Sequence, residues 1–337
     1  MENRVAVIYG GMGTESEISA LSAKFVLSEI DRELFSPLPV FIAKNGLWFI
    51  KAPDEKTEGL ACYPARTKCG CGLMTAEGFI PLFAAFPVLH GDFGEDGIIQ
   101  GALTCAGIPF VGCKTCSGAL SADKALTKQI AEAASVPTAP WVLGNEEPTD
   151  GYIEKIKLKA ELAFGYPMFI KPSVGGSSIG ISRIERSEDF SEAYLKAAKY
   201  GNRVIAEEAI SVRLELECAV LIDGKQIFTK IGAISTGGGF YDFGKKYFGG
   251  ASATPFAPIT QGVYSAVTSY AESLCSCLDI KQLSRIDFFL TDDGGIVFNE
   301  INTMPGFTAA SLYPRLIERC GIAPRELITR LIKGASL

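Results

Sequence analysis

The chain is poor in several features that mark common protein classes. It has one histidine in 337 residues, which excludes a His-rich metal centre. No apolar run approaches the ~20 residues that a membrane-spanning helix needs, and the N-terminus enters a strand without a signal-peptide pattern. The net charge is -6, which argues against nucleic acid or an anionic membrane surface as the main partner. These absences favour a soluble, cytoplasmic protein.

The ten cysteines lack the doubled C-x-x-C pattern of a structural zinc site. One C-x-x-C spans Cys113–Cys116, and two C-x-C pairs lie at Cys69–Cys71 and Cys275–Cys277. Scattered thiols in a reducing compartment behave mostly as small apolar residues. We therefore expect the cysteines to serve packing rather than metal binding or redox chemistry.

Neither of the two common glycine-rich nucleotide motifs is present. The chain contains no G-x-x-x-x-G-K-[ST], and Ser16 stands where a dinucleotide fingerprint starting at Gly11 needs its third glycine. Instead, Lys171 ends an expected strand and precedes the Gly/Ser-rich segment 172–180. The backbone N–H groups of such a turn can cradle a phosphate, and Lys171 can add its charge. The alternative is a flexible hairpin with a solvated lysine.

A hairpin near the C-terminus carries the clearest chemical signal. Asp293-Gly294 is a two-residue turn signal between two runs of strand formers. Counting outward from it, Asp287 lies opposite Glu300 and Arg285 lies opposite Asn302, all on one face. A turn shifted by one residue changes the partners but keeps all four on that face.

Two opposed carboxylates repel each other unless a positive group lies between them. Mg²⁺ suits the two carboxylates and amide oxygen of Asp287, Glu300 and Asn302, with phosphate oxygens filling its remaining positions. The alternative is a solvated hairpin face on which Arg285 neutralises one acid.

Strands and helices alternate over the first ~110 residues, which predicts a parallel α/β sheet. Residues 54–73 are rich in Thr, Gly, Cys and Pro, and we interpret them as an excursion from that sheet. A second unit is expected from about residue 114 and a third from about 208. The glycine-rich segment 235–250 is typical of a lid.

Two further segments allow two interpretations each. Glu207, Glu208 and Ile210 end an apolar strand, where backbone groups could read an adenine edge, or they could form a polar linker between domains. His90 also ends an apolar strand, where ligands gather in open α/β sheets, or it has a structural hydrogen-bonding role.

The motifs together resemble the D-alanine–D-alanine ligase family of the ATP-grasp fold. In chain order they are Leu89-His90-Gly91 with Gly94–Gly97, Asp123-Lys124, Gly176–Ser178, Phe240–Phe243 with Lys246-Tyr247, Arg285–Asp287 and Asn299–Gly306. The resemblance implies an α/β fold class: an N-terminal parallel α/β domain (residues 1–113) followed by a two-part ATP-grasp fold. The latter comprises a central subdomain (114–207) and a C-terminal, metal-binding subdomain (208–337).

The same resemblance implies ATP between the second and third units, with two Mg²⁺ ions that Mn²⁺ could replace. Asp287, Glu300 and Asn302 would hold the metal. The implied nucleotide-binding residues are Lys124, Lys171, Ser178 and Lys246 on the phosphates, and Glu207, Glu208, Ile210, Glu215 and Phe240 on the remainder of ATP.

The implied reaction makes D-alanyl-D-alanine for peptidoglycan synthesis. The carboxylate of one D-alanine attacks the γ-phosphorus of ATP, and the amine of a second D-alanine then displaces phosphate from the acyl phosphate. Phosphoryl transfer needs alignment and charge neutralisation more than a covalent protein group, so the absence of a nucleophile triad is expected. Arg285 and the backbone N–H of Gly306 would form an oxyanion hole.

Substrate contacts also follow from the resemblance. Glu15 would bind the ammonium of the first D-alanine, although it could simply be a first-turn acid that stabilises a helix N-terminus. Ser177 and Tyr247 would join Glu15 and fasten the lid, and His90 would lie near the first carboxylate. The expected contacts of the second substrate are Ser311 on its carboxylate and Leu312 on its side chain.

Acceptor choice depends on Leu312 and the lid. An apolar Leu312 would leave the hydroxyl of D-serine unpaired, at a cost of roughly 1–3 kcal/mol. The Lys246-Tyr247 pair resembles dipeptide-forming members rather than those that use D-lactate. We expect D-alanine, with a D-alanine–D-serine ligase or another ATP-grasp carboxylate–amine ligase as the alternative, and a nucleotide-binding regulator as a third hypothesis. The resemblance also suggests a homodimer.

Overall fold

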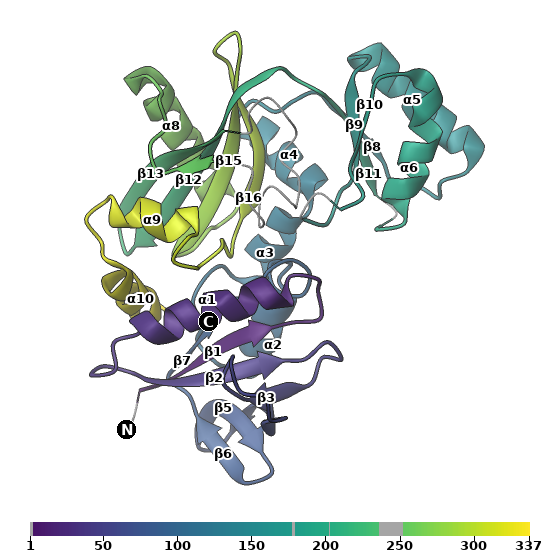
Figure 1. The fold of residues 1–337 in the computed structure, drawn as a ribbon. Helices are drawn as coiled ribbons and strands as arrows, with labels where there is room; N and C mark the ends of the chain where they lie inside the picture. Colours follow the sequence, from purple (N-terminus) through teal and green to yellow (C-terminus); the bar gives the residue numbers. More distant parts are fainter. Residues whose placement is uncertain (1–2, 177–178, 202, 236–251) are drawn as a thin grey trace.

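The computed structural model describes residues 3–176, 179–201, 203–235 and 252–337, and within these ranges the chain forms three sheets (Figure 1). The first sheet belongs to the N-terminal unit. In sheet order its strands are β6 (Gly78–Pro81), β5 (Gly70–Thr75), β4 (Leu60–Thr67), β3 (Trp48–Ile50), β2 (Ser36–Ile42), β1 (Arg4–Gly10) and β7 (Ala84–Pro87).

This sheet is parallel only at one end. β1 pairs in parallel with β2 and β7, as expected, but β2 to β6 pair antiparallel in succession. The interpretation of residues 54–73 as an excursion is therefore wrong, because β4 and most of that segment extend the sheet through β3. Its glycines mark hairpin reversals: Gly59 and Gly70 have φ of +83° and +118°, values that glycine adopts without steric cost.

Helices cover both faces of the first sheet. On one face, α1 (Ser16–Glu29) packs Ala23 and Val26 against Val5 and Val7. On the other face, α2 (Ile98–Cys105) packs against the alternate residues of β1. α10 (Pro324–Lys333) returns to lie beside α1, so the end of the chain completes the first core (Figure 1).

The central sheet forms a smaller unit with its own core. Its strands, in order, are β10 (Ser182–Ile184), β9 (Met168–Pro172), β11 (Val204–Glu208) and β8 (Trp141–Gly144). Two helices, α5 (Asp150–Ala163) and α6 (Phe190–Ala198), pack on it, and the short turn η1 (Ser187–Asp189) leads into α6 (Figure 1).

One face of the third sheet is covered by helices, and part of its other face lines the candidate site. In order its strands are β14 (Ser252–Thr254), β13 (Gln226–Ser235), β12 (Val212–Asp223), β15 (Leu283–Thr291) and β16 (Ile296–Asn302). Helices α8 (Gln261–Cys277) and α4 (Lys124–Ala133) cover one face, while α9 (Leu312–Glu318) packs near β12 and β13. The helix α3 (Thr115–Ala122), which the sequence pattern did not predict, leads into α4.

The β15–β16 hairpin has the expected pairing but a different turn. Asp287 pairs with Glu300 and Arg285 with Asn302, as expected. The turn, however, is a three-residue loop, because Thr291 N donates to Gly295 O at 2.9 Å. A bulge between Asp287 and the next pair then restores the predicted register.

Within the described ranges, every helix is too short or too polar to span a bilayer.

Candidate active site

A cavity of about 370 Å³ opens between side chains of all three units. It unites nine of the predicted site residues in its lining: Glu15, His90, Lys124, Arg285, Glu300, Asn302, Gly306, Ser311 and Leu312. These positions are spread over nearly 300 residues of sequence. The fold therefore brings together, around one cavity, residues that the sequence motifs place in separate segments.

The open face of the third sheet supplies a compact charged cluster. Arg285 binds Asp287 through two parallel hydrogen bonds, Nε to Oδ1 at 2.8 Å and Nη2 to Oδ2 at 2.7 Å. Asn302 Nδ2 also donates to Asp287 Oδ2, at 3.2 Å. On the neighbouring strand, Glu217 pairs with Asp287 in register, and its Oε2 lies 3.4 Å from Arg285 Nε.

This cluster keeps Arg285 charged although it is buried. Burial by itself would lower the pKa of Arg285, but Asp287 and Glu217 more than compensate and hold that pKa well above its usual value. A bidentate arginine–carboxylate pair also fixes the plane of the guanidinium. The cavity wall therefore carries a permanently positive, pre-oriented donor group.

The N-terminal unit contributes Glu15 and His90 to the lining of the cavity. Both are buried, and a methyl group added at Gly91 would lie only 2.4 Å from Glu15 Oε2. The left-handed backbone at position 91, with φ of +68°, favours glycine there, and the absence of a side chain leaves room for the Glu15 carboxylate. His90 Nε2 lies 2.9 Å from Ser22 Oγ on α1, so the structural hydrogen bond and the cavity position occur together.

The loop before α9 contributes Gly306, Ser311 and Leu312. Ser311 Oγ accepts a hydrogen bond from Thr308 N at 3.0 Å and lies 3.0 Å from the position that a Cβ of Gly306 would occupy. Leu312 is buried and reaches toward Gly232 of β13. A hydroxyl and an apolar side chain are thus adjacent in the wall, as expected for these positions.

The Asp123-Lys124 motif joins α4 to the glycine-rich loop. Asp123 caps α4 by accepting from Ala125 N at 2.9 Å, and it also bonds to the Ser173 hydroxyl. Lys124 Nζ donates to the Gly175 carbonyl. The lysine predicted to meet phosphate thus lies against the loop predicted to cradle it.

Lys171 and Glu207 lie outside the cavity lining, in a buried ion cluster with Lys128 of α4. Lys171 Nζ donates to Glu207 Oε1 at 2.8 Å, and Lys128 Nζ lies 2.6 Å from Oε2. Burial by itself would raise the pKa of Glu207, but the two lysines lower it. The carboxylate therefore stays ionised between them.

The other predicted nucleotide residues follow this cluster along the chain. Glu208 N donates to Pro140 O at 2.9 Å, and Ile210 N donates to Glu208 O at 3.1 Å. Glu215 lies on β12 two residues before Glu217, on the same sheet face as the charged cluster. None of the three lines the cavity.

Five predicted residues lie outside the described part of the chain: Ser177, Ser178, Phe240, Lys246 and Tyr247.

Charged residues in or beside the cavity escaped the sequence analysis, among them Glu217 and Lys128. Glu217 lines the cavity and is buried, and its signal was the strand period of two that places it on the face of Glu215. Lys128 is 1% exposed, and its signal was its place one helical turn after Lys124. Both signals are common among charged residues on solvated surfaces, so only their burial in the fold distinguishes Glu217 and Lys128 from ordinary surface charges.

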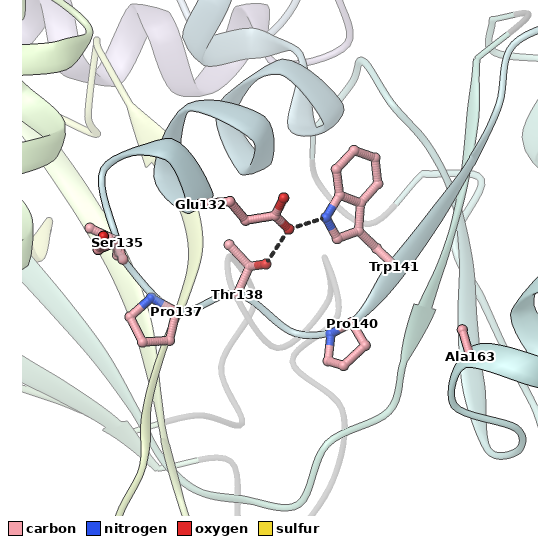
Figure 2. Close-up of a pocket in the computed structure, with 8 residues that line it drawn as sticks. Glu132, Ser135, Pro137, Thr138, Pro140, Trp141 and Ala163 are labelled. Atoms are coloured by element: carbon pink, nitrogen blue, oxygen red, sulfur yellow. Dashed lines mark hydrogen bonds between the residues drawn. The ribbon is translucent and has the colours of Figure 1, made fainter.

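A more open hollow of about 670 Å³ lies where α4 leads into β8 (Figure 2). There Glu132 Oε1 accepts from Trp141 Nε1 at 2.6 Å and from Thr138 Oγ1 at 3.0 Å. Phe298 N of the hairpin donates to Pro137 O at 2.8 Å. These hydrogen bonds therefore hold the segment that connects the third sheet to the second.

Comparison with known proteins identifies the family. A family model described as D-ala D-ala ligase N-terminus matches residues 4–113, and one described as D-ala D-ala ligase C-terminus matches residues 130–333. The chain belongs to the D-alanine–D-alanine ligase family. A D-alanine–D-alanine ligase of Acetivibrio thermocellus is 37% identical, with 98% of this chain and 95% of that protein covered. One of Deinococcus radiodurans is 36% identical, with 99% of both covered.

Solved structures agree with this membership. The VanG D-Ala:D-Ser ligase from Enterococcus faecalis has a TM-score of 0.89 and 31% identity over 99% of both chains. D-alanyl-alanine synthetase A from Vibrio cholerae has a TM-score of 0.88 and 27% identity, with 99% of this chain and 98% of that chain covered. The predicted fold class, ATP-grasp α/β, is thereby confirmed.

The donors on the open sheet face fit the divalent metal that this family implies. Among the described residues, no group of three or more His, Cys, Asp or Glu side chains suffices to hold a metal. Asp287, Glu300 and Asn302 nevertheless offer two carboxylates and an amide oxygen, the hard ligands that Mg²⁺ takes, with phosphate oxygens completing its shell. Asn302 uses its nitrogen on Asp287, which leaves its oxygen available.

Proposed function

We propose that this chain is an ATP-dependent ligase that joins two D-alanines into D-alanyl-D-alanine for peptidoglycan synthesis. One observation carries the proposal. Arg285, which Asp287 holds through two hydrogen bonds, lines a single cavity together with Gly306, Ser311 and Glu15. Arg285 and the backbone N–H of Gly306 can donate to a substrate oxygen, and Glu15 can bind an ammonium group. Together they fit an amino acid whose carboxylate is activated in this cavity.

In the first proposed step, a carboxylate oxygen of the first D-alanine forms a bond to the γ-phosphorus as the bond to ADP breaks. Glu15 accepts hydrogen bonds from the ammonium of that substrate and His90 lies near its carboxylate; both line the cavity. Lys124 and Lys171 stabilise the phosphate charge. Mg²⁺ held by Asp287, Glu300 and Asn302 would neutralise the phosphates further.

In the second step, the amine of the second D-alanine gives up its proton to solvent water and forms a bond to the activated carbonyl carbon, and the carbon–oxygen bond to phosphate breaks so that inorganic phosphate leaves. Arg285 and the Gly306 N–H stabilise the developing oxyanion, a contribution of about 3 kcal/mol per donor in comparable sites. Ser311 binds the carboxylate of the second substrate. Ser311 Oγ lies 3.0 Å from the position that a Cβ of Gly306 would occupy, so the hydroxyl faces Gly306, which supports a shared substrate contact.

The acceptor follows from Leu312. This side chain is buried and belongs to an apolar core cluster, so the hydroxyl of D-serine would find no partner on it. The similarity to a D-Ala:D-Ser ligase keeps D-serine as the second candidate acceptor. We propose D-alanine because an unpaired hydroxyl costs about 1–3 kcal/mol.

The test is a product assay on the purified protein. We expect phosphate release that requires D-alanine, ATP and Mg²⁺, and mass spectrometry of a D-alanine and D-serine mixture should show mostly D-alanyl-D-alanine. Turnover with L-alanine and none with D-alanine would refute the proposal. ATP binding without any dipeptide would favour a nucleotide-binding regulator instead.

The proposal also covers the metal ions, the oligomeric state, the location and the domain boundaries. We propose two metal ions, with Mn²⁺ able to replace Mg²⁺, a homodimer, and a cytoplasmic location. A separate sheet in each range supports the division into residues 1–113, 114–207 and 208–337, while α4 of the second range packs on the third sheet and α10 of the third range packs on the first core. Light scattering checks the dimer, and metal titration by calorimetry checks the number of ions.

A further inference from the structure

One face of α4 carries three charged residues at four-residue spacing: Lys124, Lys128 and Glu132. Each of them bonds to a group beyond the helix. Lys124 reaches the glycine-rich loop, Lys128 reaches the end of β11, and Glu132 reaches the first residue of β8 (Figure 2). This stripe therefore supplies three of the side-chain contacts between α4 and the central unit.

The helix that carries the stripe belongs to the other side of the junction. Ala131 of α4 is part of the apolar core under the third sheet, and α4 packs against β16 and α8. Lys128 thus connects the unit of the third sheet, which contains the β15–β16 hairpin, to the central sheet, which contains Lys171.

Lys128, Glu207 and Lys171 form a buried triad with unequal charge. The exposed side-chain fractions of Lys128, Glu207 and Lys171 are 1%, 6% and 8%. Glu207 Oε2 lies 2.6 Å from Lys128 Nζ, and its Oε1 lies 2.8 Å from Lys171 Nζ. Burial lowers the pKa of Lys128, while the neighbouring Glu207 carboxylate acts in the opposite direction. With both lysines protonated, two ammonium groups share one carboxylate and the triad has a net charge of +1. A buried excess charge is unfavourable by itself and favours an anionic ligand beside it.

We propose that Lys128 is a positioning residue for the nucleotide: by neutralising Glu207, it leaves the charge of Lys171 available to the phosphates of ATP. Without Lys128, Glu207 would neutralise Lys171 alone, and the triad would attract no anion. Lys128 itself need not touch ATP. This inference rests on the proposed ATP site and assigns a role to a residue of α4 that the sequence motifs do not include.

The experiment measures binding of Mg²⁺ with a non-hydrolysable ATP analogue to the full-length protein by calorimetry. Lys128→Met keeps the length of the side chain and removes its charge. We expect the Kd for the analogue to rise at least about tenfold, because one partner of a buried charge pair is lost, while the KM for D-alanine changes less than threefold. Lys157→Met is the matched control, since Lys157 pairs with the exposed Glu154 on α5 and lies outside the cavity lining, and it should leave the Kd within twofold.

A double variant separates charge balance from packing. Lys128→Met with Glu207→Gln removes the whole pair and restores the charge of Lys171. Because Glu207 is itself a proposed nucleotide contact, the reference for this variant is Glu207→Gln alone. In that background, adding Lys128→Met should change the Kd less than threefold, since no carboxylate remains for Lys128 to neutralise. Lys128→Arg, which keeps the charge, should also bind more tightly than Lys128→Met. If Lys128→Met does not fold, the double variant still carries the test.

Two outcomes would overturn the inference: a Kd of Lys128→Met within twofold of wild type, or a double variant that binds at least tenfold more weakly than Glu207→Gln alone. The binding assay also separates this inference from the proposed function. If the wild type makes no dipeptide but the affinities follow the expected order, only the function fails. If the wild type makes the dipeptide and Lys128→Met binds normally, only the role of Lys128 fails.

Discussion

Arg285 is the most constrained side chain of the site. Asp287 grips it through two hydrogen bonds and Glu217 approaches it from the next strand, while the guanidinium remains part of the cavity wall. The planar fork of arginine matches a carboxylate at two points, which the single ammonium of lysine cannot do. The identity of this residue should therefore matter beyond its charge.

Arg285→Lys should lower kcat by about two to three orders of magnitude, the usual effect of losing one oxyanion donor. The charge is kept, but the bidentate contact to Asp287 and the aimed N–H group are lost. Steady-state kinetics of dipeptide formation measures the change.

The control is Arg330→Lys. Arg330 pairs with Asp223 and Glu326, partly exposed on α10 and outside the cavity lining, so its replacement should leave kcat unchanged. Equal effects of the two substitutions would contradict the role of Arg285.

Among the elements, the β15–β16 hairpin shows how local geometry sets a functional face. Its loop occupies one residue more than the predicted two-residue turn, and the bulge between Asp287 and Phe288 compensates for that shift. Because the side-chain period of a strand is two, an uncompensated shift of one residue would move Glu300 to the opposite face. The bulge thus keeps Glu300 across from Asp287.

Gly294→Ala should destabilise this hairpin. Gly294 has φ of +88°, and a Cβ there would meet nothing within 4 Å, so the cost of about 1 kcal/mol is purely conformational. Denaturant unfolding measures the loss of stability.

Gly151→Ala offers a matched control. Gly151 lies in the first turn of α5, where a Cβ also meets nothing, and alanine should stabilise that helix by up to about 1 kcal/mol. Destabilisation of similar size by both changes would mean that the left-handed backbone of Gly294 is not the cause.

At the scale of the whole molecule, the cavity depends on all three units at once. Glu15 comes from the first, Gly175 from the second and Arg285 from the third. A ligand that contacts several units binds only the assembled arrangement, so its binding energy stabilises the whole fold.

Nucleotide and metal together should raise the midpoint of thermal unfolding. At a hundredfold excess over Kd the added stability is about 2.7 kcal/mol, which corresponds to a shift of a few degrees for a chain of this size. Differential scanning calorimetry with the non-hydrolysable analogue measures it.

Removing the metal with EDTA should abolish most of that shift, because the opposed acids Asp287 and Glu300 would then repel the phosphates. EDTA alone should leave the midpoint of the unliganded protein unchanged. A nucleotide-induced shift that persists fully in EDTA would argue against a metal role for this sheet face.

Local sequence patterns predicted the pairing within the β15–β16 hairpin correctly, but they did not predict how the N-terminal sheet is extended. The alternation of side chains along 284–302 was enough to pair Asp287 with Glu300, because a strand has only two faces. The same reasoning failed for β4 and β5, because their composition does not say whether a hairpin extends a neighbouring sheet or leaves it. The helix α3 was missed because its Ser- and Gly-rich sequence has little helical periodicity.

The sequence by itself determined the order of the motifs, the family resemblance that they carry and the common face of Arg285 and Asp287, since each depends on neighbours within a short stretch of chain. Only the tertiary structure decided that Glu217 joins that face and that Lys128 is buried against Glu207. The charge of a lysine is visible in any sequence. Whether that charge is solvated or enclosed is decided by the packing of segments that lie far apart along the chain.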